Sequence, residues 1–179
     1  LILILLLGSA CKKEKTELDK LPEATRTGQN TGGCLIDGQA FVATGWDGNL
    51  LSNGIPPLTG GFSFDSAYIV NLYGQRGGSN VKIMLYLQND KPTTYLLNKN
   101  TQYYPQGSPR VILNHATYSE SNAGGEVYVT SAQHTGQVLL TNADLRTGIG
   151  SGTFMFTAAS TFDRTKTITV TNGRFDRKQ

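Results

Sequence analysis

Hydrophobic and polar residues alternate along most of the chain after residue 30. In the clearest stretch, 81–88, every second residue is Val, Ile or Leu. A period of two residues is typical of a β-strand with one buried face, whereas a helix repeats every 3.6 residues. Strands are expected at 34–36, 39–43, 62–73, 81–88, 94–97, 111–115, 126–130, 137–141, 153–158, 167–171 and 174–176. Short strands spaced by turn residues predict an all-β domain over residues 31–179, an antiparallel β-sandwich or flattened barrel of about ten strands.

Two dipeptides predict tight hairpin turns between these strands. Asp37-Gly38 and Asn172-Gly173 have the residue types that adopt positive φ, as the type I′ turn requires. The stretches 44–61 and 98–109 are rich in Gly, Pro and Asn, and we expect both to be long loops.

The N-terminal residues predict export. Leu1–Leu7 is an unbroken apolar run, small residues follow at 8–10, and Cys11 comes next. The run is too short for a membrane-spanning helix, which needs about 20 residues, but it suits a secretory signal peptide. Residues 8–11 resemble a lipobox, and the resemblance implies that Cys11 carries a diacylglyceryl group. We therefore expect a signal peptide at 1–10, and a lipidated cysteine with a flexible tether at 11–30.

This anchor predicts an outer-membrane lipoprotein of a bacterium, held to the membrane by its acyl chains. The mixed charges of residues 12–20 leave both the periplasmic face and the cell surface open.

Composition narrows the function further. The net charge of +3 comes without a basic stripe, so nucleic acid is not an expected partner. With Cys11 acylated, Cys34 has no partner for a disulfide, and we expect it to be a buried side chain. We expect no cofactor and no metal, since neither His-x-His nor HExxH occurs. The protein is expected to be a monomer.

Catalytic chemistry has little support in the sequence. His115 shares its parity with two hydrophobic positions, so it is expected to be a satisfied core or edge histidine. His134 falls in a predicted turn, and no Gly-x-Ser-x-Gly motif marks a nucleophile. We therefore assign no catalytic residue.

Binding is the favoured function, through aromatic residues in the two long loops. Trp46 lies in the first loop, and Tyr103 and Tyr104 lie in the second. Exposed aromatic side chains suit contact with a glycan or an envelope protein, although they can also fold back onto the ends of the domain. The sequence predicts a non-catalytic binding or structural module. The alternatives are a lipocalin-like carrier of a small ligand and, third, an envelope hydrolase.

Segments at both ends of the mature chain resemble one family. They are Leu21–Thr25, 28–31 and 33–38 near the start, and 152–158 and 168–176 near the end. These segments are similar to envelope lipoproteins of the Bacteroidetes type grouped as domain of unknown function 6252. The resemblance implies a lipid anchor and an all-β domain, and it supplies no catalytic residue.

The C-terminal segments also carry residues with expected structural roles. Phe154, Phe156 and Phe175 are core candidates. Arg174 and Asp176 share one parity and are expected to pair on an exposed face.

Overall fold

The computed structural model describes residues 14–48, 53–63, 67–106, 112–121 and 124–179. Their regular elements are one short 3₁₀ helix and eleven strands. The elements are η1 (Leu18–Lys20), β1 (Thr31–Ile36), β2 (Gln39–Val42), β3 (Leu58–Phe62), β4 (Tyr68–Arg76), β5 (Ser79–Leu87), β6 (Thr94–Leu97), β7 (His115–Glu120), β8 (Val127–Val129), β9 (Gly136–Asp144), β10 (Ile149–Ser160) and β11 (Thr167–Lys178).

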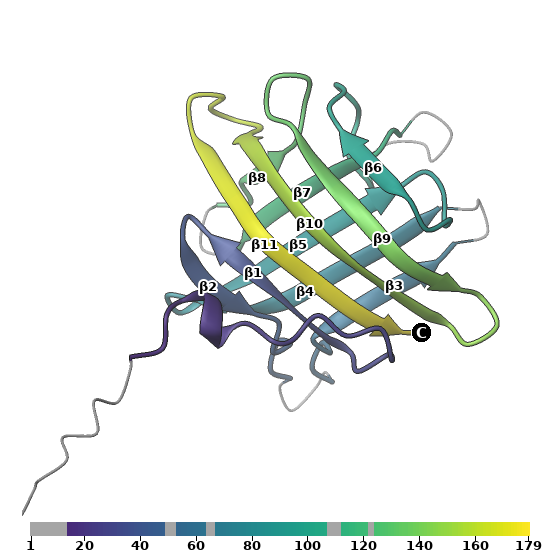
Figure 1. Ribbon diagram of the computed structural model, residues 1–179. Helices are drawn as coiled ribbons and strands as arrows, with labels where there is room; N and C mark the ends of the chain where they lie inside the picture. The colour runs from purple at the N-terminus through teal and green to yellow at the C-terminus, as the bar shows by residue number, and fades with distance from the viewer. Residues whose placement is uncertain (1–13, 49–52, 64–66, 107–111, 122–123) are drawn as a thin grey trace, which may run out of the picture.

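All strands belong to one antiparallel sheet that curls into a half-barrel (Figure 1). The hydrogen-bonded order is β2-β1-β11-β10-β8-β7-β5-β4-β3, with β9 beside β10 and β6 beside β9. β10 bends the sheet, because its first part pairs with β9 and its last two residues pair with β8. In Figure 1, β1, β11, β10 and β9 form a front layer that crosses β3, β4 and β5 behind it. The predicted all-β antiparallel fold is confirmed.

The hydrophobic core fills the space between the two layers. Alternate residues of β4 are buried, as the period of two predicts, whereas β5 buries every residue from Ile83 to Leu87. Phe154, Phe156 and Phe175 join this core, which confirms their predicted burial. Gly173 lies opposite Phe154 on the neighbouring strand, where an added Cβ would approach the ring to 2.5 Å. Glycine at this position therefore makes room for the large ring.

The two predicted hairpin turns have different outcomes. Asp37 and Gly38 both have positive φ and connect β1 to β2, as expected for a two-residue turn. The turn predicted at Asn172-Gly173 is wrong, because β11 runs through both residues. Asn172 has a φ of 53° at a β-bulge, where the register with β10 shifts. Some β-bulges, like the type I′ turn, place a residue at positive φ, so the same dipeptide suits either.

The long loop predicted at 44–61 contains a strand that the pattern missed. β3 begins at Leu58, which is buried, and pairs with β4. Gly60 and Gly61 occupy the middle of this strand and have no side chains, so they interrupt the visible alternation. An added Cβ at Gly60 would lie 2.2 Å from the Ile69 carbonyl oxygen, so the close approach of β4 favours glycine there.

Part of the predicted tether lies against the domain. A Glu17 carboxylate oxygen accepts a hydrogen bond of 2.8 Å from the Ala40 amide on β2. Leu21 is buried, and residues 25–29 wrap around the side chain of Asp176. Residues 25–29 of the expected tether are therefore bound to β11 by the Asp176 carboxylate, whereas most side chains at 14–20 are exposed. The signal peptide and Cys11 lie outside the described residues.

Candidate binding surfaces

The three aromatic residues expected to bind a ligand occupy separate environments. Trp46 is half-buried, and its indole N–H faces the carbonyl oxygens of Gly74 and Val81 at 3.1 and 3.2 Å. Its ring packs edge-on against Tyr73, with 4.9 Å between the centroids. These contacts fix the indole against β4 and β5, as the alternative of folding back onto the domain predicts.

Tyr104 helps to cover the outer face of β4, β5 and β7. Its ring stacks on Tyr86 at 5.9 Å, and Tyr86 stacks on His115 at 5.2 Å. Ala67, Met84, Tyr86 and Ile112 form a second, smaller hydrophobic cluster under this cover. The loop that contains Tyr104 therefore closes one outer face of the sheet.

His115 is buried within this covered region, and both of its ring nitrogens have partners. Nδ1 lies 2.8 Å from the Leu113 carbonyl oxygen, and Nε2 accepts a hydrogen bond of 3.1 Å from the Tyr104 amide. These contacts assign the proton to Nδ1. Burial lowers the pKa of His115, although the contact with Leu113 opposes this change. The prediction of a satisfied buried histidine is confirmed, and neither nitrogen is available to a substrate in this arrangement.

Tyr103 lines a hollow of about 280 Å³ at one end of the sheet. The hollow lies between the loop that follows β6, the end of β8 and the turn that connects β10 to β11. Its lining residues are Asn100, Thr101, Gln102, Tyr103, Val129, Thr130, Ser131, Thr161 and Arg164. Trp46 and Tyr104 are not among them, so this hollow contains one of the three predicted residues.

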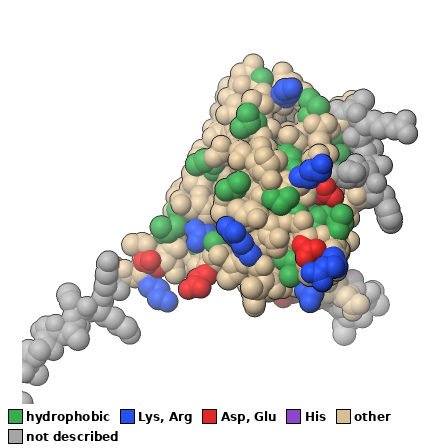
Figure 2. Space-filling model, turned by 45° about the vertical axis from the view of Figure 1, so that its right-hand side comes forward, with side chains coloured by type: hydrophobic (Ala, Val, Ile, Leu, Met, Phe, Trp, Pro, Cys, Tyr) green, Lys and Arg blue, Asp and Glu red, His purple; other side chains and the backbone are tan. Residues whose placement is uncertain are grey.

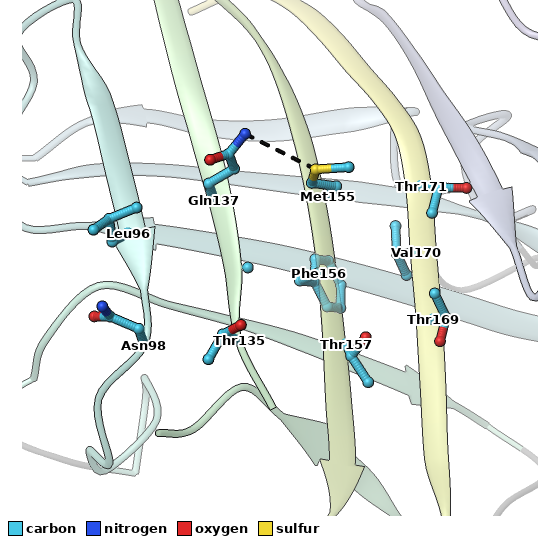
Figure 3. Close-up of a pocket in the computed structure, with 11 residues that line it drawn as sticks. Leu96, Asn98, Thr135, Gln137, Met155, Phe156, Thr157, Thr169, Val170 and Thr171 are labelled. Carbon is cyan, nitrogen blue, oxygen red and sulfur yellow. Dashed lines mark hydrogen bonds between the residues drawn. The ribbon is translucent and has the colours of Figure 1, made fainter. Parts of the chain in front are cut away.

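The larger hollows lie on the outer surface of β6, β9, β10 and β11, and we call this surface the outer groove. One hollow measures about 460 Å³ and the other about 420 Å³. Both are lined by Gln137 and Met155, so they adjoin. Figure 3 shows these two side chains extending toward each other from β9 and β10, with 3.9 Å between Nε2 and Sδ.

Apolar and hydroxyl side chains mix on the outer groove. Leu96, Leu139 and Met155 are 54%, 41% and 46% exposed, which is unusual for large hydrophobic residues in a sheet. The hydroxyl-bearing residues that line the groove are Thr94, Thr135, Thr153, Thr157, Thr169 and Thr171. Figure 2 turns the side with β6 and β9 toward the viewer, and most of the charged side chains visible there lie in the lower half of the molecule.

Charge is nearly absent from the outer groove. Among the described residues that line it, only Arg174 is charged. The guanidinium of Arg174 donates to the Pro22 carbonyl oxygen at 3.2 Å and to the Asn172 carbonyl oxygen. This surface therefore suits an uncharged, partly apolar ligand, because a charged ligand would lose its hydration without gaining a partner of opposite charge.

The N-terminal segment borders the outer groove, and Asp176 holds it there. The Asp176 side chain is 1% exposed and accepts hydrogen bonds from the Thr25 and Ser151 hydroxyls. Three backbone amides at residues 27–29 donate to the same carboxylate. Burial alone would raise the pKa of Asp176, but these hydrogen bonds lower it to about 2. The predicted pairing of Arg174 with Asp176 is wrong, since each binds the N-terminal segment instead.

A polar cluster lies at the end of the sheet that contains the β1–β2 turn. Arg76 forms ion pairs with Glu120 at 3.3 Å and with Asp37 at 4.0 Å. Tyr118 also donates to Glu120. The one positive and two negative groups line a hollow of about 140 Å³.

Two other properties concern metals and membranes. Among the described residues, no group of three or more His, Cys, Asp or Glu side chains is placed to hold a metal ion. No helix in that part of the chain is long and apolar enough to span a bilayer. Cys34 is buried as predicted, and burial raises the pKa of its thiol.

Sequence reasoning missed the outer groove because its residues look ordinary one at a time. The available signal was the composition of outward-facing positions in β10 and β11, where Thr153, Met155, Thr157, Thr169 and Thr171 carry no charge. An exposed strand face usually includes charged residues.

Comparisons with known proteins identify the family. The family model of DUF6252, a domain of unknown function, matches residues 59–177, which extend from β3 into β11. The C-terminal segments that carried the resemblance lie inside this match, and the segments from 21 to 38 lie before it. A search of curated proteins and a search of solved structures found no match. The match covers well over half of the chain, which therefore belongs to the DUF6252 family.

Proposed function

We propose that this protein is a lipid-anchored component of a bacterial cell envelope and acts as a non-catalytic binding module. Its ligand is an uncharged molecule that lies along the outer groove. The observation that carries the binding proposal is the pair of adjoining hollows on a nearly uncharged sheet face with three exposed hydrophobic side chains.

The anchoring part of the proposal rests on the N-terminal sequence. Small residues precede Cys11 after an apolar run, as in a lipobox. Two acyl chains on one cysteine supply enough buried methylene groups for stable attachment to a bilayer. Orientation toward the periplasm or the cell surface is left open by the charges at 12–20.

Binding on the outer surface is favoured over a lipocalin-like cavity because of the core. The space between the layers is filled by a continuous cluster of buried side chains, including Phe154, Phe156 and Phe175. A carrier would need this space for its ligand. A hydrolase is less favoured because backbone groups occupy both nitrogens of His115.

Metabolic labelling tests the anchor. The full-length protein should incorporate labelled palmitate in a bacterial host that processes lipoproteins, and Cys11→Ser should abolish the label. Cys34→Ser is the matched control and should keep it, because that thiol is buried. Equal labelling of Cys11→Ser and the parent protein would refute lipidation at this position.

Thermal-shift screening of the full chain against neutral glycans and acyl compounds tests the groove, since binding to the native state raises its stability. For any compound that raises the melting temperature, Met155→Glu should remove the shift by placing a charge in the middle of the groove. Leu145→Glu is the control, because Leu145 is 67% exposed and does not line the groove. An undiminished shift in Met155→Glu would place binding elsewhere.

A further inference from the structure

The hollow that contains Tyr103 lies at the opposite end of the molecule from the N-terminal segment. In Figure 1, residues 14–30 run along the lower end, whereas the β10–β11 turn and the loops that follow β6 and β8 lie at the upper end. Loops at the end of a β-sandwich commonly carry binding residues, because the strands hold them in place.

The wall of this hollow is fixed by hydrogen bonds from its own loops. The side-chain oxygen of Asn100 accepts from the Ala132 amide at 3.1 Å, and the Thr101 hydroxyl accepts from the Leu113 amide at 2.9 Å. These contacts connect the loop after β6 to the residues after β8 and before β7. The hollow is therefore a built feature of the fold.

Three side chains around the hollow do not take part in these connections between loops. Gln102, Tyr103 and Arg164 line it, and their side chains make no hydrogen bond or ion pair with any described residue. They supply an amide, a phenol ring with its hydroxyl, and a guanidinium. Within the described residues, these groups are available to contact a ligand.

The hollow has a positive group on its wall. Arg164 is the only charged residue among the described residues that line it. The nearby carboxylate of Asp163 accepts hydrogen bonds from the backbone and hydroxyl of Thr165, so it is already occupied within the turn. A guanidinium favours a carboxylate, to which it can donate two parallel hydrogen bonds, and the Arg164 side chain has no such partner among the described residues.

We propose that this hollow binds the end of an acidic oligosaccharide, a saccharide with a carboxylate on its terminal unit. The Tyr103 ring packs against the apolar face of the sugar, Gln102 bonds to ring hydroxyls, and Arg164 pairs with the carboxylate. A volume of about 280 Å³ lies at the small end of ligand pockets, which suits a terminal unit. This site is separate from the outer groove and does not depend on the proposed function of that groove.

Titration of the full chain with oligogalacturonate, followed by calorimetry, tests the proposal. A neutral galactose oligomer of the same length is the matched ligand. We expect the acidic oligomer to bind. Arg164→Gln should weaken its binding by about tenfold or more, because losing a hydrogen bond to a charged group lowers affinity by at least this factor. Raising the salt concentration should weaken binding to the parent protein and have less effect on Arg164→Gln.

Tyr103→Ala should weaken binding similarly, and Tyr103→Phe should retain most of it if the ring is the contact. Leu145→Ala, outside both the hollow and the outer groove, should bind as the parent does. Melting curves of each variant check that it folds. Absence of binding by the parent protein, equal binding of the neutral oligomer, or an unchanged affinity in Arg164→Gln would each overturn the proposal.

Discussion

The two outer faces of the half-barrel are built from similar alternating strands, yet one is covered and the other is open. On β4, β5 and β7, the outward-facing Met84, Tyr86 and His115 are buried beside Tyr104 and Ile112. On β6, β9 and β10, the outward-facing Leu96, Leu139 and Met155 remain about half exposed.

This difference separates hydrophobic residues that stabilise the fold from those that are available for binding. A side chain contributes to folding by the apolar area that it removes from water. The rings on the covered face have already lost their exposure, whereas the side chains of the open face lose theirs only when a ligand or partner arrives. Burial of the side chains on the open face can therefore still contribute to the free energy of binding a ligand.

Truncation of one residue on each face should reveal this difference as unequal losses of stability. Tyr86 is buried and stacks between Tyr104 and His115, so Tyr86→Ala should lower the free energy of unfolding by about 3 kcal/mol. Met155→Ala on the open face should change it by less than about 0.5 kcal/mol. Urea denaturation of both variants measures the contrast. Similar losses in the two variants would show that the faces do not differ in this way.

The regular part of the fold was predictable because strand alternation is a local property. Buried alternation in β4 and the hairpin at Asp37-Gly38 both follow from residues that are adjacent in the sequence. β3 was not predictable in this way, since its two glycines erase the pattern and pairing with β4 defines it.

The binding surfaces were harder to predict because they depend on contacts between distant segments. Tyr103 and Tyr104 are adjacent in the sequence, but one lines a hollow and the other covers Tyr86. From the sequence, Asp176 was expected to be an exposed partner for Arg174. In the structure, residues 25–29 cover it and donate hydrogen bonds to its carboxylate. No pattern within β11 indicates that a segment about 150 residues earlier supplies the donors.

The boundary of the open face is held by this carboxylate, and its protonation should therefore weaken the protein. The pKa of Asp176 is about 2 in the fold, compared with an ordinary value of 3.8. A lowered pKa contributes stability that is present above about pH 4 and is lost as the pH falls through about 2. The shift corresponds to roughly 2 kcal/mol.

Asp176→Asn tests this contribution. The variant should be less stable than the parent by roughly 2 kcal/mol at pH 7, and the gap should narrow as the pH approaches 2. Asp47→Asn is a control at an exposed position and should match the parent at pH 7. Denaturation curves across this pH range provide the measurement. A gap that stays constant with pH would show that the charge of Asp176 is not the source of the stabilisation.

The covered face should respond to pH in a different range, through His115. Burial lowers the pKa of this histidine below its ordinary value of 6.5, so the fold favours the neutral ring. Its contribution to stability is complete above about pH 6.5 and declines as the pH falls below that value, because the unfolded chain takes up the proton more readily. His115→Gln stays neutral throughout and keeps both a donor and an acceptor. The difference in unfolding free energy between the parent and His115→Gln should therefore shrink from pH 7.5 to pH 5, a range in which Asp176 stays ionised in the fold. A difference that is the same at both pH values would mean that the cover over Tyr86 and His115 admits enough water to solvate the charged ring, and the two outer faces would then be more alike than their burial indicates.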